Sequence, residues 1–299
     1  MPTISVPAYG KINLALYVLG KRPDGYHDIS TLMQAVDTCD RLQFDSNATD
    51  LQFTCDDPEL PVGDDNLVVK AIRLLEREVG RVLPMRVHLE KVLPVGAGMG
   101  GGSSDAASTL WGVNKLYNLN LHVERLRELA AELGSDVPFF LTSGQAIAEG
   151  RGDQLVEVDW PVDYHLLLGF PGVPVSAAEG YRRARISLTN PLSDCKIHRR
   201  LAPEKFWGWV GSQENDLAAG ITASYPVVAR GIEAMNSLGA RYAGMTGSGS
   251  AVFGLFDEPL APTLWQTRLT SQEWRVWPAR PLRITGSLLP ATGWVSPGG

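Results

Sequence analysis

The 299-residue sequence predicts an α+β fold divided into two domains. Stretches of alternating apolar and polar residues, typical of strands, and stretches with helical spacing are mixed through both halves of the chain. The chain is also longer than the roughly 100–200 residues that one domain usually takes. The periodic pattern loosens over residues 159–163. We therefore expect a first domain over 1–158, a second over 159–285, and a poorly ordered tail rich in Gly, Pro and Ser over 286–299.

Composition excludes several classes of protein. Hydrophobic residues make up 44% of the chain and charged residues 20%, which is ordinary for a globular protein. The formal net charge of −6 offers no surplus of positive charge for a phosphate backbone, so we expect no nucleic-acid partner. No apolar run approaches the roughly 18 residues of a membrane helix, so we expect a cytoplasmic protein without a membrane partner. Composition leaves monomer and homodimer equally open.

The cysteines also point to a reducing compartment. Cys39, Cys55 and Cys195 are odd in number, widely spaced and without a CxxC pair. That pattern favours free thiols over a disulfide framework or a zinc site.

The first elements follow from alternation and from turn residues. Residues 12–18 alternate and predict a strand that ends at Gly20, followed by a turn through residues 22–25. Apolar residues at helical spacing over 67–75 predict a helix with a stop at Gly80.

A strand, a glycine-rich segment and two helices come next. Residues 85–89 alternate and predict a strand closed by Pro94. Helical spacing over 106–113 and over 126–133 predicts two helices, and Gly134 ends the second.

The second half repeats the mixture of strands and helices. We expect strands at 166–168, near Tyr242, at 251–256 and near 274–277, a helix over about 227–238 and a short helix before the last strand.

The most informative segment is residues 94–107, which holds five glycines within seven residues. Glycine permits positive φ and close backbone approach, so several N–H groups can converge on phosphate oxygens at the start of the following helix. A flexible loop with a helix cap at Ser103 or Ser104 is the plainer alternative. The predicted phosphate-binding residues are Pro94, Gly96, Ala97, Gly98, Met99, Gly100, Gly101, Gly102, Ser103 and Ser104.

The spacing of the glycines leaves the phosphate ligand open. Gly96, Gly98 and Gly101 match GxGxxG, the dinucleotide-binding pattern, which would indicate a nicotinamide-dependent oxidoreductase. The acidic residue expected about twenty positions later is missing from residues 116–121. A nucleotide P-loop is also excluded, because no Lys follows the last glycine.

With its neighbouring blocks, this segment resembles the family of galactokinase, homoserine kinase, mevalonate kinase and phosphomevalonate kinase, the GHMP kinases. Met99 stands where the family usually has Leu, and Gly10 where it more often has Ala. The blocks that carry the resemblance are GKINL at 10–14, RPDGYH at 22–27, NLV at 66–68, GGGSSDAA at 100–107, GSDVPFF at 134–140, PGV at 171–173, ND at 215–216 and MTGSG at 245–249.

The resemblance implies a fold and a reaction. The fold is an N-terminal ATP-binding domain like ribosomal protein S5 domain 2, followed by a C-terminal ferredoxin-like domain. The blocks are most similar to those members that phosphorylate a hydroxyl of a cytidine-diphosphate-linked methylerythritol, with ATP and Mg²⁺, in the non-mevalonate route to isoprenoids. Mevalonate, homoserine or a sugar stays an alternative acceptor, and a non-catalytic RNA-binding module a further alternative.

Three polar residues are candidates for the chemistry. Asp136, between a helix stop and a Pro-Phe-Phe run, is the candidate base and a substrate contact, although a turn-forming Asp would look the same. Lys11 is the candidate electrostatic partner of Asp136 and of the transferring group. Asn13 shares the strand parity of Lys11, so we expect both side chains on one side of the sheet and Asn13 near the acceptor hydroxyl.

The remaining candidates concern the acceptor's base and the metal. The resemblance implies that Tyr26 and His27 recognise cytidine, by stacking on the cytosine ring and by hydrogen bonds to its edge. Tyr181 would form the second side of a stacking sandwich. Gly247, in a second glycine loop, would approach the substrate closely. Ser104 is the candidate ligand of the Mg²⁺ that accompanies ATP.

Overall fold

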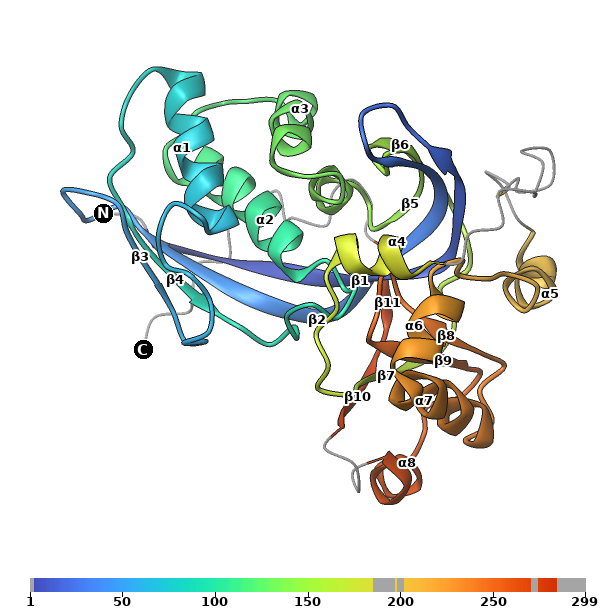
Figure 1. Cartoon of the computed structure of the whole chain (residues 1–299). Helices are drawn as coiled ribbons and strands as arrows, with labels where there is room; N and C mark the ends of the chain where they lie inside the picture. Colours follow the sequence, from blue (N-terminus) through green and yellow to red (C-terminus); the bar gives the residue numbers. More distant parts are fainter. Residues whose placement is uncertain (1–2, 185–196, 198–201, 270–273, 284–299) are drawn as a thin grey trace.

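Two β-sheets, each covered by helices, form the computed structural model, which describes residues 3–184, 197, 202–269 and 274–283 (Figure 1). This mixture confirms the predicted α+β class. The predicted tail and Cys195 lie outside the described residues. Within them, the first sheet contains β1 (Thr3–Lys21), β2 (His27–Asp45), β3 (Gln52–Cys55), β4 (Arg86–Glu90), β5 (Gln145–Gly150), β6 (Gln154–Glu157) and β11 (Pro281–Leu282).

Strands β1 and β2 form a long antiparallel hairpin through the predicted turn, and β2 also pairs with β4, β5 and β11. The sequence signal revealed β1 but not β2. Residues 29–36 of β2 are buried on both faces, so they do not alternate between apolar and polar. Strands β3, β5, β6 and β11 were likewise not predicted.

Three helices cover one face of the first sheet: α1 (Leu67–Val79), α2 (Gly101–Leu116) and α3 (Val123–Leu133) (Figure 1). Both predicted ends of α1 are confirmed. The Asn66 side chain accepts a hydrogen bond from the N–H of Val68, and Gly80 ends the helix with φ of 67°. Helix α2 begins earlier than the predicted 106–113, so the glycine-serine residues from Gly101 onward form its first turn.

The second sheet lies below the first in Figure 1 and contains β7 (His165–Phe170), β8 (Tyr242–Met245), β9 (Val252–Phe256) and β10 (Arg275–Ala279), as predicted. Its neighbours are α4 (Ala177–Arg183), η2 (Pro203–Lys205), α5 (Phe206–Val210), α6 (Ala218–Ser224), α7 (Pro226–Ser237) and α8 (Pro262–Leu269). A core that includes Val228, Met235 and Trp274 packs α7 onto this sheet.

The two sheets are joined by a shared core and by the chain itself. Ile12 and Leu14 of β1 belong to the same buried cluster as Leu166 of β7 and Phe253 of β9. After β10 the chain returns to the first sheet, where β11 pairs with β2. The centre of β1 therefore pairs with β2 in its own sheet and also packs against the second sheet.

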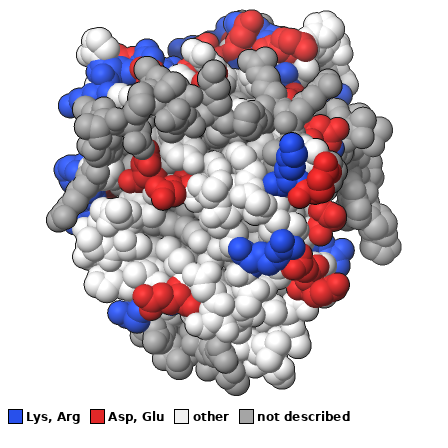
Figure 2. Space-filling model, turned by 90° about the vertical axis from the view of Figure 1, so that its right-hand side faces the viewer, with Lys and Arg blue, Asp and Glu red and all other residues white. Residues whose placement is uncertain are grey.

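Two further features of the fold are the distribution of charge on one face and the character of the described helices. On the face drawn in Figure 2, acidic and basic side chains lie in small mixed groups separated by uncharged residues. Within the part of the chain that the structure describes, no helix combines the length and the apolar character needed to cross a membrane.

Candidate active site

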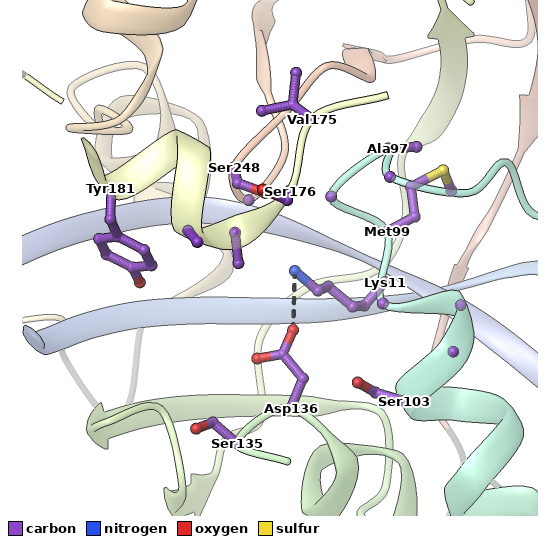
Figure 3. Close-up of a pocket in the computed structure, with 18 of the residues that line it drawn as sticks. Lys11, Ala97, Met99, Ser103, Ser135, Asp136, Val175, Ser176, Tyr181 and Ser248 are labelled. Atoms are coloured by element: carbon purple, nitrogen blue, oxygen red, sulfur yellow. Dashed lines mark ion pairs between the residues drawn. The ribbon is translucent and has the colours of Figure 1, made fainter. Parts of the chain in front are cut away.

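A cavity of about 1050 Å³ opens between the two sheets. Its walls come from β1, from the glycine segment and α2, from the start of η1 (Val137–Leu141), from α4 and from the loop between β8 and β9. Figure 3 shows Lys11 and Asp136 facing each other across this space, with Tyr181 towards one end and Met99 and Ser103 towards the other.

The glycine segment forms a loop and then a helix start. Gly96, Gly98 and Gly100 have positive φ values of 65°, 75° and 71°, a region that residues with a side chain rarely adopt. Gly100 is the N-cap of α2. The N–H groups of the first helical turn have no partner within the helix and carry the positive end of its dipole. This end of the cavity is therefore suited to an anion such as a phosphate.

The second glycine loop packs directly against the first. A Cβ atom on Gly98 would lie 2.2 Å from the carbonyl oxygen of Thr246, and one on Gly247 would lie 2.8 Å from the carbonyl oxygen of Gly98. The Thr246 hydroxyl donates to the Gly98 carbonyl (3.2 Å) and accepts from the N–H of Asn13 (3.0 Å). One buried hydroxyl thus joins both loops to β1.

Lys11 is the buried cation of the site, with a side chain only 4% exposed. Its Nζ donates to Asn13 Oδ1 (2.6 Å) and lies 3.5 Å from Asp136 Oδ2. The contact with Asn13 confirms that both side chains lie on one side of the sheet. Asn13 Nδ2 in turn donates to the Thr31 hydroxyl (2.8 Å), which fixes the orientation of the carboxamide.

Asp136 comes from the turn before η1 and is 36% exposed, so its carboxylate borders the cavity while Lys11 lies beneath it. A carboxylate at the edge of the cavity can accept a proton from a hydroxyl that is brought next to it. The sequence analysis expected Lys11 to be the partner of Asp136, and the packing of η1 beside β1 brings the two side chains together.

Aromatic rings line the other end of the cavity. The rings of His27 and Tyr181 stack, with centroids 4.9 Å apart and planes 7° from parallel. Burial, and to a smaller extent the nearby carboxylate of Asp136, raises the pKa of Tyr181 to about 12. Tyr26 is 54% exposed, and the guanidinium of Arg151 lies 5.2 Å from its ring centre. Tyr181 thus stacks on His27, whereas Tyr26 faces Arg151.

The end of the cavity nearest α1 is largely apolar, with Leu60, Pro61 and Leu67 in its wall. Asn66 lies there too, so the residue that caps α1 also borders the cavity. The block NLV at 66–68 contains Asn66 and Leu67, but the sequence analysis assigned neither residue to the site.

Beneath the start of α2 lies a buried charged cluster that the sequence did not reveal. Lys91 Nζ donates to Asp40 Oδ2 and to Asp105 Oδ2, the latter at 3.0 Å, and all three side chains are at most 6% exposed. Burial, followed by the nearby carboxylate of Asp40, raises the pKa of Asp105 to about 7, although Lys91 acts in the opposite direction.

The structure brings most of the predicted site residues to this cavity. Ser104 is the exception: its hydroxyl is buried, does not border the cavity, and has no hydrogen-bond partner among the described residues. The predicted residues that line the cavity are Lys11, Asn13, Tyr26, His27, Pro94, Gly96, Ala97, Gly98, Met99, Gly100, Gly101, Gly102, Ser103, Asp136, Tyr181 and Gly247. Lining residues that the sequence did not suggest include Lys21, Asp65, Lys91, Ser135, Arg151, Ser176 and Arg182.

Comparison with protein families yields two matches. Residues 66–144 match the model described as the GHMP kinases N terminal domain, and residues 200–267 match the model of the GHMP kinases C terminal region. The first match includes the glycine loop and Asp136, and the second includes Gly247.

Individual relatives match over most of the chain. A protein of Chlorobium phaeobacteroides named 4-diphosphocytidyl-2-C-methyl-D-erythritol kinase is 38% identical over 259 residues, which is 86% of this chain and 88% of the relative. A protein of Geobacter sp. with the same name is 38% identical over 262 residues, or 86% and 91% of the two chains.

Solved structures agree with the fold. A crystal structure of 4-(cytidine 5'-diphospho)-2C-methyl-D-erythritol kinase superposes with a TM-score of 0.79 and 31% identity, covering 93% of this chain and 99% of the other. A homoserine kinase from Cytophaga hutchinsonii has a TM-score of 0.70, covers 97% of each chain and is only 17% identical, so that likeness concerns the fold alone.

Proposed function

The chain belongs to the 4-diphosphocytidyl-2-C-methyl-D-erythritol kinase family of GHMP kinases, and from this premise we propose that it transfers the γ-phosphoryl group of ATP to the 2-hydroxyl of that cytidine compound. GHMP kinases are ATP-dependent small-molecule phosphotransferases, so the reaction class follows from the family. The comparisons favour this function over a nicotinamide-dependent oxidoreductase and over another acceptor.

One observation supports the proposal most directly: Lys11 and Asp136 lie between an anion-binding helix start and an end lined by aromatic rings. A triphosphate held at Gly96–Ser103 would point its terminal phosphate towards Lys11. An acceptor whose cytosine ring lies near Tyr181 would bring its sugar alcohol towards Asp136.

The chemistry follows from this arrangement. Asp136 would accept the proton of the acceptor hydroxyl as its oxygen attacks the γ-phosphorus. The bond from that phosphorus to the bridging oxygen breaks, and ADP leaves. Lys11, buried and held by Asn13, would stabilise the charge on the transferring group at a fixed position. Asn13 donates through Nδ2 to Thr31, which leaves that amide's second N–H for an acceptor oxygen.

Mg²⁺ enters the proposal together with ATP, and when bound it neutralises charge on the phosphate oxygens. Mg²⁺ keeps several waters and phosphate ligands and needs few protein oxygens. The described residues contain no cluster of three or more His, Cys, Asp or Glu that could hold a metal by itself. The hydroxyl of Ser104, the predicted ligand, is buried and does not border the cavity, so phosphate oxygens and water would supply most of the ligands of the metal.

Recognition of cytidine would come from the aromatic end. A cytosine ring can stack on Tyr181, on its own or between Tyr181 and Tyr26, and the imidazole of His27 can donate to or accept from the base edge. Arg151 would orient the ring of Tyr26, and Gly247 would allow the second loop to approach the acceptor. An acceptor without a nucleobase would have no ring to stack on these aromatic side chains.

The proposal is tested by ADP release with ATP and Mg²⁺, offering the cytidine compound, mevalonate, homoserine and galactose separately. We expect turnover of the cytidine compound alone. Asp136→Asn should lower kcat by about 10²- to 10⁴-fold with little change in ATP affinity. Asp257→Asn removes a carboxylate that pairs with Arg241 on the surface and serves as the control. Turnover of another acceptor, or an unchanged kcat in Asp136→Asn, would contradict the assignment.

A further inference from the structure

The buried cluster of Asp40, Lys91 and Asp105 joins segments on either side of the glycine loop. Asp40 lies on β2, Lys91 follows β4, and Asp105 lies near the start of α2. Lys91 Nζ is held between the two carboxylates, and Lys91 and Asp105 border the cavity. The cluster therefore lies directly behind the phosphate-binding end of the site.

Asp40 fixes the beginning of the loop. Its Oδ1 accepts hydrogen bonds from the backbone N–H groups of Val92 (2.6 Å) and Leu93 (2.7 Å). Leu93 is the residue before Pro94, where the loop starts. Hydrogen bonds to a fully buried carboxylate are strong, so the direction in which the chain enters the loop is set by Asp40.

Lys91 fixes the end of the loop through Asp105. The Lys91 ammonium donates to Asp105 Oδ2 at 3.0 Å, and Asp105 is carried by the helix whose first turn holds the proposed phosphate donors. A Cβ atom on Gly101 would lie 3.3 Å from Lys91 Nζ and 3.3 Å from Leu93 Cβ. The two ends of the loop therefore touch each other and the cluster at the same place.

Stability alone does not explain Asp105. Its side chain is 5% exposed, and its Oδ1 has no hydrogen-bond partner among the described residues. Burying a carboxylate oxygen without a partner costs free energy of folding. This cost is offset only in part by the contact of Oδ2 with Lys91, so we look for the role of the carboxylate in how that contact holds the loop.

We propose that Asp40, Lys91 and Asp105 are positioning residues that hold the two ends of the phosphate-binding loop together and so set its N–H groups for a nucleoside triphosphate. This inference rests on the proposed ATP-dependent function. None of the three needs to contact the nucleotide: Lys91 acts through its two carboxylates, and its charge is already balanced by them.

The test is calorimetric titration of ATP with Mg²⁺ into the whole chain without acceptor, alongside titration of cytidine diphosphate. Asp105→Ala removes one of the two acceptors of Lys91, and we expect ATP to bind about tenfold more weakly while cytidine diphosphate binds as before. The melting temperature of each variant is measured in parallel, so that a loss of stability is separated from a loss of ATP affinity. Asp105→Asn keeps an acceptor oxygen and should recover most of the ATP affinity. Glu78→Gln removes a surface ion pair with Arg125 and should change the affinity for neither ligand.

The results of these titrations distinguish an error in the positioning role from an error in the proposed function. ATP affinity in Asp105→Ala equal to that of the wild type, or a lower melting temperature with unchanged ATP affinity, would overturn the positioning role. Tighter ATP binding in Asp105→Ala would mean that Lys91, once released, binds phosphate directly. A wild-type chain that binds no ATP would remove the proposed function itself.

Discussion

Replacing Gly98 by alanine tests whether the two glycine loops form one binding surface. The φ of Gly98 is 75°, and a Cβ atom there would lie 2.2 Å from the Thr246 carbonyl oxygen and 3.1 Å from the Gly249 nitrogen. Those atoms belong to the backbone and cannot rotate away as a side chain would. The alanine variant must therefore push the second loop away from the first.

The cost can be worked out from the structure. An alanine with left-handed φ costs about 1–2 kcal/mol. Separation of the loops would break the hydrogen bond from the Thr246 hydroxyl to the Gly98 carbonyl and the one from the Ala251 N–H to the Ala97 carbonyl, each 3.2 Å long. At about 1 kcal/mol for each hydrogen bond, we expect a total of about 3–4 kcal/mol.

Gly102→Ala is the matched control, because it makes the same chemical change in the same segment. Gly102 lies in the first turn of α2, and its Cβ would meet only Leu67 Cδ1, at 3.5 Å. Alanine is favoured over glycine within a helix by about 0.5–1 kcal/mol. Gly102→Ala should therefore be as stable as the wild type or slightly more stable.

The assay is urea unfolding of both variants, followed by ATP titration of each folded protein. Gly98→Ala should unfold at a much lower urea concentration and bind ATP at least tenfold more weakly. Equal stability of the two variants would refute the reasoning, because it would mean that the loops do not pack as tightly as the geometry indicates.

Three further predictions concern packing, acceptor recognition and pH. Gly10→Ala should cost about 1 kcal/mol because its Cβ would lie 2.8 Å from Leu93 Cδ2 and 3.3 Å from Met99 Cε, and Met99→Leu should relieve the smaller part of that cost in a double-mutant cycle. Tyr181→Leu should raise KM for the cytidine acceptor about tenfold and leave KM for ATP unchanged, whereas Tyr181→Phe should behave like the wild type. Burial raises the pKa of Asp216, whose carboxylate accepts from the Val18 N–H. The folded chain thus holds that proton more tightly than the unfolded chain, and stability falls as pH rises through the interval between the two pKa values. Asp216→Asn should flatten this part of the curve of unfolding free energy against pH.

Gly10 and Met99, the two positions where the sequence analysis noted a departure from the family pattern, lie close together in the structure. A Cβ on Gly10 would lie 2.8 Å from Leu93 Cδ2 and 3.3 Å from Met99 Cε. Both neighbouring side chains therefore limit the space for a methyl group at this position, and Leu93 limits it more than Met99 does.

Helices and strands with one apolar face and one polar face could be predicted from the sequence, and elements without that pattern could not. Helix α1 has an apolar face, a capping Asn66 and a terminal Gly80, so its bounds could be predicted. Strand β2 has neither signal, because residues 29–36 are buried on both faces. The short helices α5 and α6 have five and seven residues, too few for a helical period to be recognised.

The family and the reaction class were determined by the sequence alone, because both depend on short blocks whose order is preserved in the chain. The chemistry of the glycine loop is local: positive φ at Gly98 and free N–H groups at the start of α2 require only neighbouring residues. The predicted family is confirmed by relatives 38% identical to the chain.

Only the tertiary structure gave the geometry in which distant groups meet. Lys11 and Asp136 come from different elements, and their 3.5 Å separation depends on how η1 packs beside β1. The same is true of the ring of His27 on Tyr181 and of Lys91 between its two carboxylates. Contacts between residues far apart in the chain are set by the packing of whole elements, and no local pattern of residues records that packing.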